Sequence, residues 1–195
     1  VNNEIASDEA ILFNKKFQKF TSNNKFSFYH YSCTGALAIE AAIKTAMDYK
    51  NGKKRVISFK GSFHGINGYG GIVTDRFEPV NQRLKGFPGA YWDQFDNPII
   101  KTDKSISEIE DKVVGVLKNI EELIKSKNDV CSILVEPIQC TNGDQFFTPS
   151  FFSGLRKISN AYDIPLIFDE IQTGFCATGN TWYYESLNIE PDSLV

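Results

Sequence analysis

The sequence predicts an α/β protein with a mostly parallel sheet and helices on both faces. Short apolar runs alternate with helical patterns through most of the 195 residues, as in chains whose parallel strands are joined by right-handed helical crossovers. The apolar run Pro165–Phe168 leads directly into two carboxylates, Asp169 and Glu170. A buried parallel strand delivers such side chains to the carboxyl edge of its sheet, where open α/β proteins bind ligands.

The composition indicates a single soluble domain and argues against several classes of protein. Hydrophobic residues make up 42% of the chain and charged residues 23%, which is ordinary for a globular domain. The net charge of -3 and the lack of a Lys/Arg cluster argue against a nucleic-acid-binding surface. No apolar run reaches the roughly 20 residues that span a membrane. Two histidines and four dispersed cysteines give no metal-site spacing, and such cysteines lead us to expect a cytoplasmic protein.

The first third of the chain contains two predicted helices and two predicted strands. Apolar residues recur at helical spacing over residues 7–21. Aromatic and polar residues alternate over residues 26–31, which predicts a strand. Residues 35–49 form a second apolar stripe at helical spacing, ended by Asn-Gly. A strand over residues 55–59 then runs into a Gly-rich loop at 61–71.

The middle of the chain combines an irregular segment with a long helix. Residues 75–103 are rich in Pro, Asn and Asp without a clear period, so we expect a long irregular excursion. A helix is predicted over residues 106–126, and Ser105 with Glu108 has the spacing of a capping box.

The last third returns to alternating strands and helices. Residues 130–136 read as a strand that ends in a carboxylate, and residues 137–147 as a loop. Thr148 is placed to cap a helix over Pro149–Tyr162, with proline at its first position. After the strand that leads into Asp169, a short helix or turn contains Trp182.

Three features suggest a binding site, each with a structural alternative. Gly35 and Ala36 open a helix, where backbone N–H groups and the helix dipole favour an anion such as phosphate, although small residues there also serve packing alone. Phe63 is suited to stacking on a flat ring or to the core, and His64 to acid–base work or to a structural role. Asp169, if buried, needs a cationic partner such as a protonated ring nitrogen, unless it caps a helix or is held structurally.

A flat, phosphorylated, pyridine-like cofactor would use all three features together. Together with these features, the sequence contains Phe168–Gly174, Thr178-Gly179 and Pro191-Asp192. On these stretches it closely resembles the class III (omega) aminotransferases, which are pyridoxal-phosphate enzymes of fold type I. The resemblance covers essentially the whole chain and is greatest to the L-lysine 6-transaminases. Further matching stretches are Gly35–Glu40, Phe63–Gly65 with Gly68-Tyr69, Trp92 with Asp96–Pro98, and Glu136–Gln139 with Gly143-Asp144.

The resemblance implies a role for each matching residue. The residues implied to bind pyridoxal 5′-phosphate are Gly35, Ala36, Phe63, His64, Asp169, Ile171 and Gln172. Phe63 and Ile171 would cover opposite faces of the ring. Asp169 would pair with the ring nitrogen, and Gln172 would hydrogen-bond the ring hydroxyl. Two carboxylates would support the site from behind, namely Glu136 and Glu170.

The sequence departs from the family's pattern where substrates are bound. Ile66 stands where the family often has an Arg that grips a substrate carboxylate, and Ala177 replaces another common Arg. Thr141 stands where a Glu often masks a second substrate-binding Arg. Residues expected to contact the substrate are Gln172, Thr141 and Ile66. The changes at Ile66 and Thr141 would alter carboxylate recognition.

The resemblance also sets expectations for the whole protein. The family's Schiff-base lysine normally lies a few residues after Pro191-Asp192, so we expect it beyond Val195 and expect residues 1–195 alone to be inactive. The chain would be a fragment of the large, cofactor-binding domain, lacking an N-terminal segment and the small C-terminal domain. The complete enzyme would be a homodimer.

The expected reaction is transfer of the terminal amino group of L-lysine, or of a similar ω-amine, to 2-oxoglutarate. The partners would therefore be a small-molecule amino donor and a 2-oxo acid, with no nucleic acid and no membrane. Alternatives are a family member specific for 4-aminobutyrate, ornithine or a diamine, and a non-catalytic paralogue.

Overall fold

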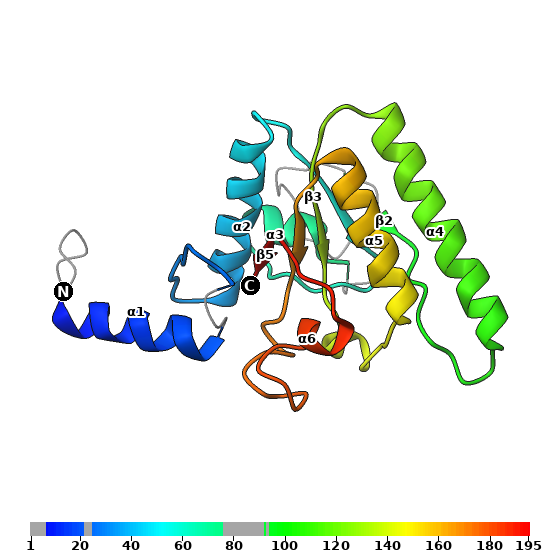
Figure 1. Cartoon of the computed structure of the whole chain (residues 1–195). Helices are drawn as coiled ribbons and strands as arrows, with labels where there is room; N and C mark the ends of the chain where they lie inside the picture. The colour runs from blue at the N-terminus through cyan, green and yellow to red at the C-terminus, as the bar shows by residue number, and fades with distance from the viewer. Residues whose placement is uncertain (1–6, 22–24, 76–91, 93) are drawn as a thin grey trace. The chain divides into compact units, whose positions relative to one another are not determined.

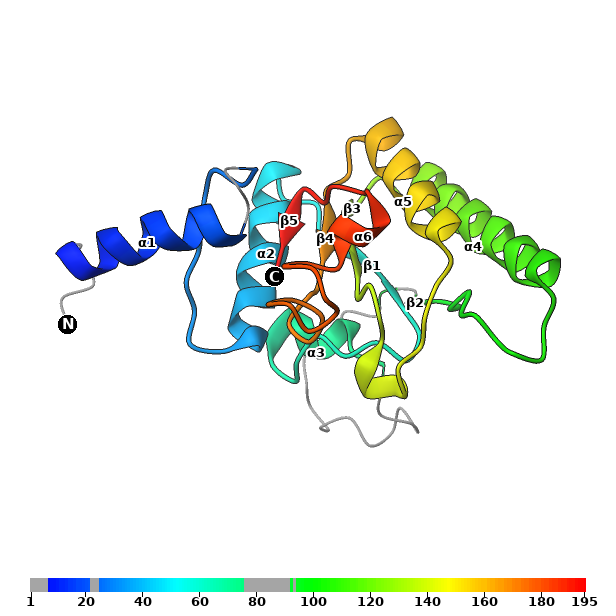
Figure 2. The ribbon, with the colours of Figure 1, turned by 60° about the horizontal axis from the view of Figure 1, so that its bottom comes forward.

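The computed structural model describes residues 7–21, 25–75, 92 and 94–195. The chain divides after Tyr31 into two compact units, each described here by itself. Among the described residues of the second unit, five strands form one sheet in the order β2-β1-β3-β4-β5 (Figures 1 and 2). Every neighbouring pair is parallel. The strands are β1 (Arg55–Phe59), β2 (Gln94–Phe95), β3 (Val130–Val135), β4 (Leu166–Phe168) and β5 (Ser193–Leu194). The predicted parallel sheet is therefore confirmed.

Helices cover both faces of this sheet, as predicted. Figures 1 and 2 show α2 (Gly35–Tyr49) on one face and α4 (Ile106–Ser126) with α5 (Pro149–Tyr162) on the other. The buried face of α2 packs against β1, β3 and β4 in a common core. That core includes Ile39, Ile43, Ala46, Val56, Cys131, Leu134 and Ile167. On the other face, Phe151 of α5 lies 5.3 Å from Phe59 of β1, measured between ring centroids.

Two helix starts test the predicted caps. At α4 the capping box is confirmed, because Glu108 N donates to Ser105 Oγ and Ser105 N donates to Glu108 Oε2. At α5 the predicted proline start is confirmed and Thr148 is the N-cap residue as predicted, but its side chain makes no capping hydrogen bond. The Thr148 hydroxyl instead lies 2.6 Å from Ser150 Oγ, which competes for it.

The first unit contains one helix, α1 (Asp8–Thr21), within its described residues, as predicted. The predicted strand over residues 26–31 is wrong, because this segment pairs with no other strand in the described structure. Its aromatic side chains pack against the helix instead: the Tyr29 and Tyr31 rings lie 5.7 and 5.8 Å from Phe17. Alternation alone does not make a strand when no sheet edge is available to pair with.

Two further expectations need correction. The Gly-rich stretch is not wholly a loop, because it contains α3 (Gly68–Val73), where Glu40 Oε1 accepts a hydrogen bond from Gly70 N. The irregular excursion over residues 75–103 includes strand β2, while its residues 76–91 and 93 lie outside the described part. Trp182 lies in a bend directly before α6 (Tyr184–Leu187), in line with the predicted helix or turn. No described helix is both long and apolar enough to cross a membrane.

Candidate functional site

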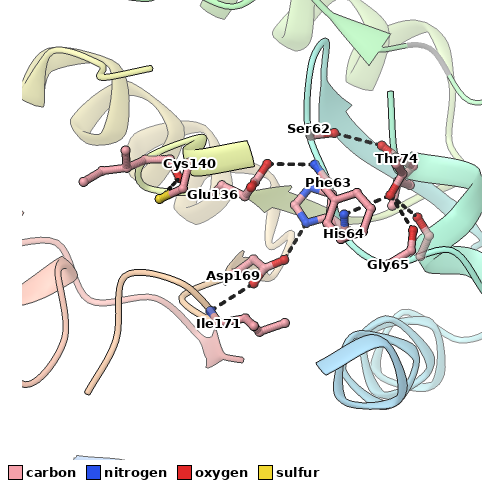
Figure 3. A network of polar contacts seen from close by, with 12 residues as sticks. Ser62, Phe63, His64, Gly65, Thr74, Glu136, Cys140, Asp169 and Ile171 are labelled. Carbon is pink, nitrogen blue, oxygen red and sulfur yellow. Dashed lines mark hydrogen bonds and ion pairs between the residues drawn. The ribbon is translucent and has the colours of Figure 1, made fainter. Parts of the chain in front are cut away.

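The site lies where three neighbouring parallel strands end. The register pairs Val135 of β3 with Phe168 of β4, and β1 lies on the other side of β3. Because parallel strands share one carboxyl edge, the residues that follow them meet there. Figure 3 shows the resulting cluster, with His64 following β1, Glu136 following β3 and Asp169 following β4.

Asp169 and His64 form the centre of the cluster. His64 Nδ1 lies 2.7 Å from Asp169 Oδ2, although 105 residues separate the two in sequence (Figure 3). Asp169 is 5% exposed and its Oδ1 accepts a further hydrogen bond from Ile171 N, at 3.2 Å. The other ring nitrogen of His64, Nε2, is buried and has no hydrogen-bond partner among the described residues. The sequence suggested both residues separately, but did not suggest that they pair.

Glu136 is the second buried carboxyl group of the cluster. It directly follows β3, and its Oε2 accepts a hydrogen bond from Phe63 N, at 2.9 Å. Burial raises the pKa of Glu136 to about 7, although the positive potential of His64 and the Phe63 N–H oppose this shift and Asp169 adds to it. The hydrogen bond to Phe63 N fixes the backbone that presents the Phe63 ring, which is partly exposed.

A closed loop between β1 and α3 holds Phe63 and His64 in place. Thr74 Oγ1 accepts a hydrogen bond from His64 N at 2.9 Å, and it lies 2.7 Å from the carbonyl oxygen of Gly65. Ser62 Oγ donates to the Val73 carbonyl at 2.9 Å. Because Val73 and Thr74 end α3, these contacts bind the loop to the end of that helix and position its two side chains on a fixed backbone. No local sequence signal points to Thr74, because its partners are set by tertiary folding.

The start of α2 meets both strand-end loops. Thr34 caps this helix by accepting a hydrogen bond from Leu37 N, a signal readable in a Thr directly before a predicted helix. An added Cβ at Gly35 would lie 2.7 Å from Ile171 Cδ1. Gly65 has a φ of +101°, and an added Cβ there would lie 2.8 Å from Ala36 Cβ. The structure therefore brings the predicted phosphate cradle next to the loops that carry Phe63 and Asp169.

Glu170 faces away from this pairing and closes the turn that follows β4. It is 1% exposed and accepts hydrogen bonds from Tyr183 N and Tyr184 N, at 2.6 and 2.8 Å. Thr173 Oγ1 donates to it as well, at 3.0 Å. Burial raises the pKa of Glu170, and these donors oppose the shift. Its contacts are those of a residue that holds a turn.

The three expected substrate contacts lie apart from the hydrogen-bonded cluster. Ile66 is 60% exposed, Gln172 is exposed, and the Thr141 hydroxyl is buried without a hydrogen-bond partner in the described part of the chain. No hydrogen bond joins any of these three to Asp169 or His64 within the described residues. Their roles remain predictions.

The charged, polar and apolar groups around the site fit a flat cation that carries an anionic group. Among the described residues, no Lys or Arg hydrogen-bonds Asp169 or Glu136, so a cationic ligand would balance their charge. The capped start of α2, a fifteen-residue helix, offers backbone N–H groups to an anion beside them. Phe63 and Ile171, each with exposed apolar surface, suit the two faces of a ring.

Comparisons with known proteins point to one family. A model of the family described as aminotransferase class-III matches residues 1–195. The L-lysine-epsilon aminotransferase of Mycobacterium tuberculosis is 28% identical over 203 residues, which cover 98% of this chain and 44% of that protein. The 4-aminobutyrate aminotransferase of Dictyostelium discoideum is 38% identical over 145 residues, covering 72% of this chain and 28% of that protein.

A solved structure, the lysine aminotransferase from M. tuberculosis in the internal aldimine form, has a TM-score of 0.89. It is 28% identical and covers 98% of this chain and 46% of that chain. The chain therefore spans less than half the length of these relatives. Since the family model matches the whole chain and the α/β fold is shared, this chain belongs to the class-III aminotransferases.

Proposed function

We propose that this chain forms part of a pyridoxal-phosphate-dependent aminotransferase that transfers the terminal amino group of L-lysine, or of a similar ω-amine, to 2-oxoglutarate. One observation carries the proposal. A buried aspartate at the end of β4 is fixed by His64 at 2.7 Å, beside the capped start of α2. Class III aminotransferases are pyridoxal phosphate enzymes, and this arrangement supplies what that cofactor requires of its protein.

Several residues near the site would each have a distinct role in binding the cofactor. Gly35 and Ala36 would bind its phosphate through backbone N–H groups. Asp169 would pair with the ring nitrogen and keep it protonated, and His64 would orient that carboxylate. Bound there, pyridoxal phosphate supplies an electron sink for the carbon that carries the transferred amino group.

The remaining residues would enclose and support the ring. Phe63 and Ile171 would cover its two faces and exclude water, and Gln172 would hydrogen-bond its hydroxyl group. Glu170 keeps the turn that carries Ile171 and Gln172 closed, through the hydrogen bonds that it accepts.

The preference for an ω-amine is supported by the relatives rather than by the site. One relative is named an L-lysine-epsilon aminotransferase and another a 4-aminobutyrate aminotransferase. Both names refer to a compound that carries a terminal amino group. The exposed apolar Ile66 and the neutral Thr141 add no charge to this part of the site. The alternative is therefore a different ω-amine, such as 4-aminobutyrate, ornithine or a diamine.

The proposal extends to the complete protein. The Schiff-base lysine would lie beyond Val195, residues 1–195 would be part of the large domain, and a homodimer in the cytoplasm would be the active form. Residues 1–195 alone would then be inactive.

The proposal is tested on the protein expressed from its complete gene. Pyridoxal phosphate is added, the mixture is reduced with borohydride, and modified lysines are located by mass spectrometry. A cofactor adduct on one lysine of the reduced sample, together with glutamate formation from 2-oxoglutarate by the unreduced enzyme with lysine as donor, supports the proposal. A folded protein without an adduct overturns it and leaves a non-catalytic paralogue, whereas an adduct with activity only on another amine corrects the substrate alone.

A further inference from the structure

Glu136 is a buried carboxyl group that the proposed cofactor contacts do not use. It is 6% exposed, directly follows β3, and accepts one hydrogen bond in the described structure, from Phe63 N at 2.9 Å. Figure 3 shows the carboxylates of Glu136 and Asp169 both directed toward the segment that carries Phe63 and His64. Two carboxyl groups and one imidazole therefore share one buried cluster.

The cluster has more negative than positive charge if all its groups ionise. Even with His64 protonated, two ionised carboxylates leave a net charge of about -1, which is costly to bury without compensation. The titratable group in the turn after β3, the Cys140 thiol, lies against the Ile138 carbonyl, has a pKa raised mainly by burial and supplies no positive charge. No Lys or Arg in the described structure hydrogen-bonds either carboxylate.

The hydrogen bonds indicate which carboxyl group holds a proton. Asp169 accepts hydrogen bonds from two donors, His64 Nδ1 and Ile171 N, and donors of this kind stabilise a negative charge. Glu136 accepts from Phe63 N alone. Burial also raises the pKa of Glu136 to about 7, with Asp169 adding to the shift. The proton is therefore placed on Glu136.

We infer that Glu136 holds a proton while no cationic ring is bound and releases it to solvent when such a ring pairs with Asp169. This inference rests on the proposed function, because the ring is that of the proposed cofactor. The ring's positive charge compensates one carboxylate, so the second can ionise. Glu136 is then a positioning residue that couples cofactor affinity to pH.

The test measures proton release during binding of pyridoxamine 5′-phosphate, which needs no Schiff base. The protein from the complete gene, freed of cofactor, is titrated by calorimetry in PIPES and in ACES buffers, whose ionisation enthalpies differ. At about pH 6, wild type is expected to release up to about one proton more than Glu136→Gln. The dissociation constants of wild type and Glu136→Gln for pyridoxamine 5′-phosphate should differ most at about pH 8, where ionised Glu136 favours binding of the cationic ring. The difference between the two proteins should narrow toward about pH 6.

Two further variants separate this coupling from a purely structural role. Glu136→Asp keeps a titrating carboxyl group but shortens its reach to Phe63 N, so proton release should persist even if affinity falls. Glu122→Gln removes a charge from an exposed site on α4 and should behave as wild type. If Glu136→Gln does not fold, the comparison of Glu136→Asp with wild type still tests the role of Glu136. The proton that Glu136→Asp releases on binding should then leave at a different pH from the proton that wild type releases.

The outcomes distinguish the two proposals. Equal proton release by wild type and Glu136→Gln, with parallel pH dependence of binding, overturns the role of Glu136 and leaves the proposed function standing. Failure of wild type to bind pyridoxamine phosphate at all overturns both. Release that depends on a titrating side chain at position 136 supports both.

Discussion

The two edges of the sheet handle charge in different ways. At the amino edge, three carboxylates that lie near strand starts are paired with cations. These pairs are Arg55–Asp129, Lys50–Asp163 and Arg156–Asp192, with nitrogen–oxygen distances of 2.8, 2.8 and 2.9 Å. At the carboxyl edge, the buried carboxylates are met only by N–H groups, a hydroxyl and one imidazole among the described residues. They are Glu136, Asp169 and Glu170.

The difference separates holding the fold from binding a ligand. The charge of a carboxylate that is already paired with Arg or Lys is compensated, so the carboxylate does not attract a cationic ligand. An exposed pair of this kind contributes about 1 kcal/mol or less to stability. Lys60, which follows β1, pairs with the exposed Asp96 rather than with the buried carboxylates. The carboxyl edge thus keeps negative charge for a cation that the described chain does not itself provide.

The largest expected effect on activity comes from removing a carboxylate charge at the carboxyl edge, compared with the same change at the amino edge. Asp169→Asn keeps the shape of the side chain but removes its charge, so kcat/KM of the complete protein should fall about 10³-fold, or about 4 kcal/mol. Asp129→Asn removes a charge at the amino edge and should change kcat/KM by less than about twofold. Steady-state kinetics measure both, and equal losses would show that the edges do not differ in function.

A pH-dependent stability difference should follow from Glu136. Its folded-state pKa is raised from 4.5 to about 7, so between these values the unfolded chain has lost a proton that the folded protein still holds. The stability that Glu136 contributes is therefore full at low pH and falls as pH rises through about 7. Without cofactor, the unfolding free energy of wild type relative to Glu136→Gln should drop by about 3 kcal/mol between about pH 4 and pH 8.

Urea denaturation of the two proteins across this pH range measures the difference. The Glu136→Asp variant should show a pH-dependent loss in the same direction, because it still titrates. A constant offset between wild type and Glu136→Gln at every pH would contradict the raised pKa.

A matched pair of glycines compares the backbone at the two edges. Gly65 and Gly52 have φ angles of +101° and +82°, but an added Cβ would meet Ala36 at Gly65 and nothing within 4 Å at Gly52. Gly52→Ala should therefore cost about 1 kcal/mol from backbone strain, and Gly65→Ala about 2 kcal/mol because it also displaces the start of α2. Thermal unfolding measures both, while cofactor affinity should fall only for Gly65→Ala.

The smallest expected effect lies in an ion pair of the amino edge. Arg55 binds both carboxylate oxygens of Asp129 and holds the pKa of that carboxyl below its usual range. Asp129 is half exposed, so solvent screening limits the loss in Arg55→Met to about 1 kcal/mol at neutral pH. The stability from a lowered pKa is present at neutral pH and is lost as pH falls through the folded value, so wild type and variant should converge only below the usual pKa of an aspartate. A difference that persists in acid would point to lost packing of the Arg55 side chain.

Much of the fold was predictable because its signals are local. The apolar stripe of α2, the capping box of α4 and the proline start of α5 are each contained in a few neighbouring residues. Features that depend on distant partners were not predictable. Glu40 supports α3 from another helix, and residues 26–31 alternate like a strand yet find no strand partner in the described structure.

The site divides in the same way. Asp169 and the start of α2 could be found because strand ends and helix starts are recognisable in sequence. The 2.7 Å contact between His64 and Asp169, and the hydrogen bond from Phe63 N to Glu136, depend on which strands become neighbours. Strand order is a tertiary property, so no local pattern announces these contacts.

The strand order also governs when the site can form during synthesis on the ribosome. β1 lies between β2 and β3, and its pairing with β3 joins residues about as far apart as Arg55 and Val130. His64 leaves the ribosome long before Asp169, and the apolar faces of α2 and β1 wait for β3 and β4 to cover them. A nascent chain paused before β4 would expose this core surface, which makes that interval the point at which a chaperone is most useful and a ribosomal pause most harmful.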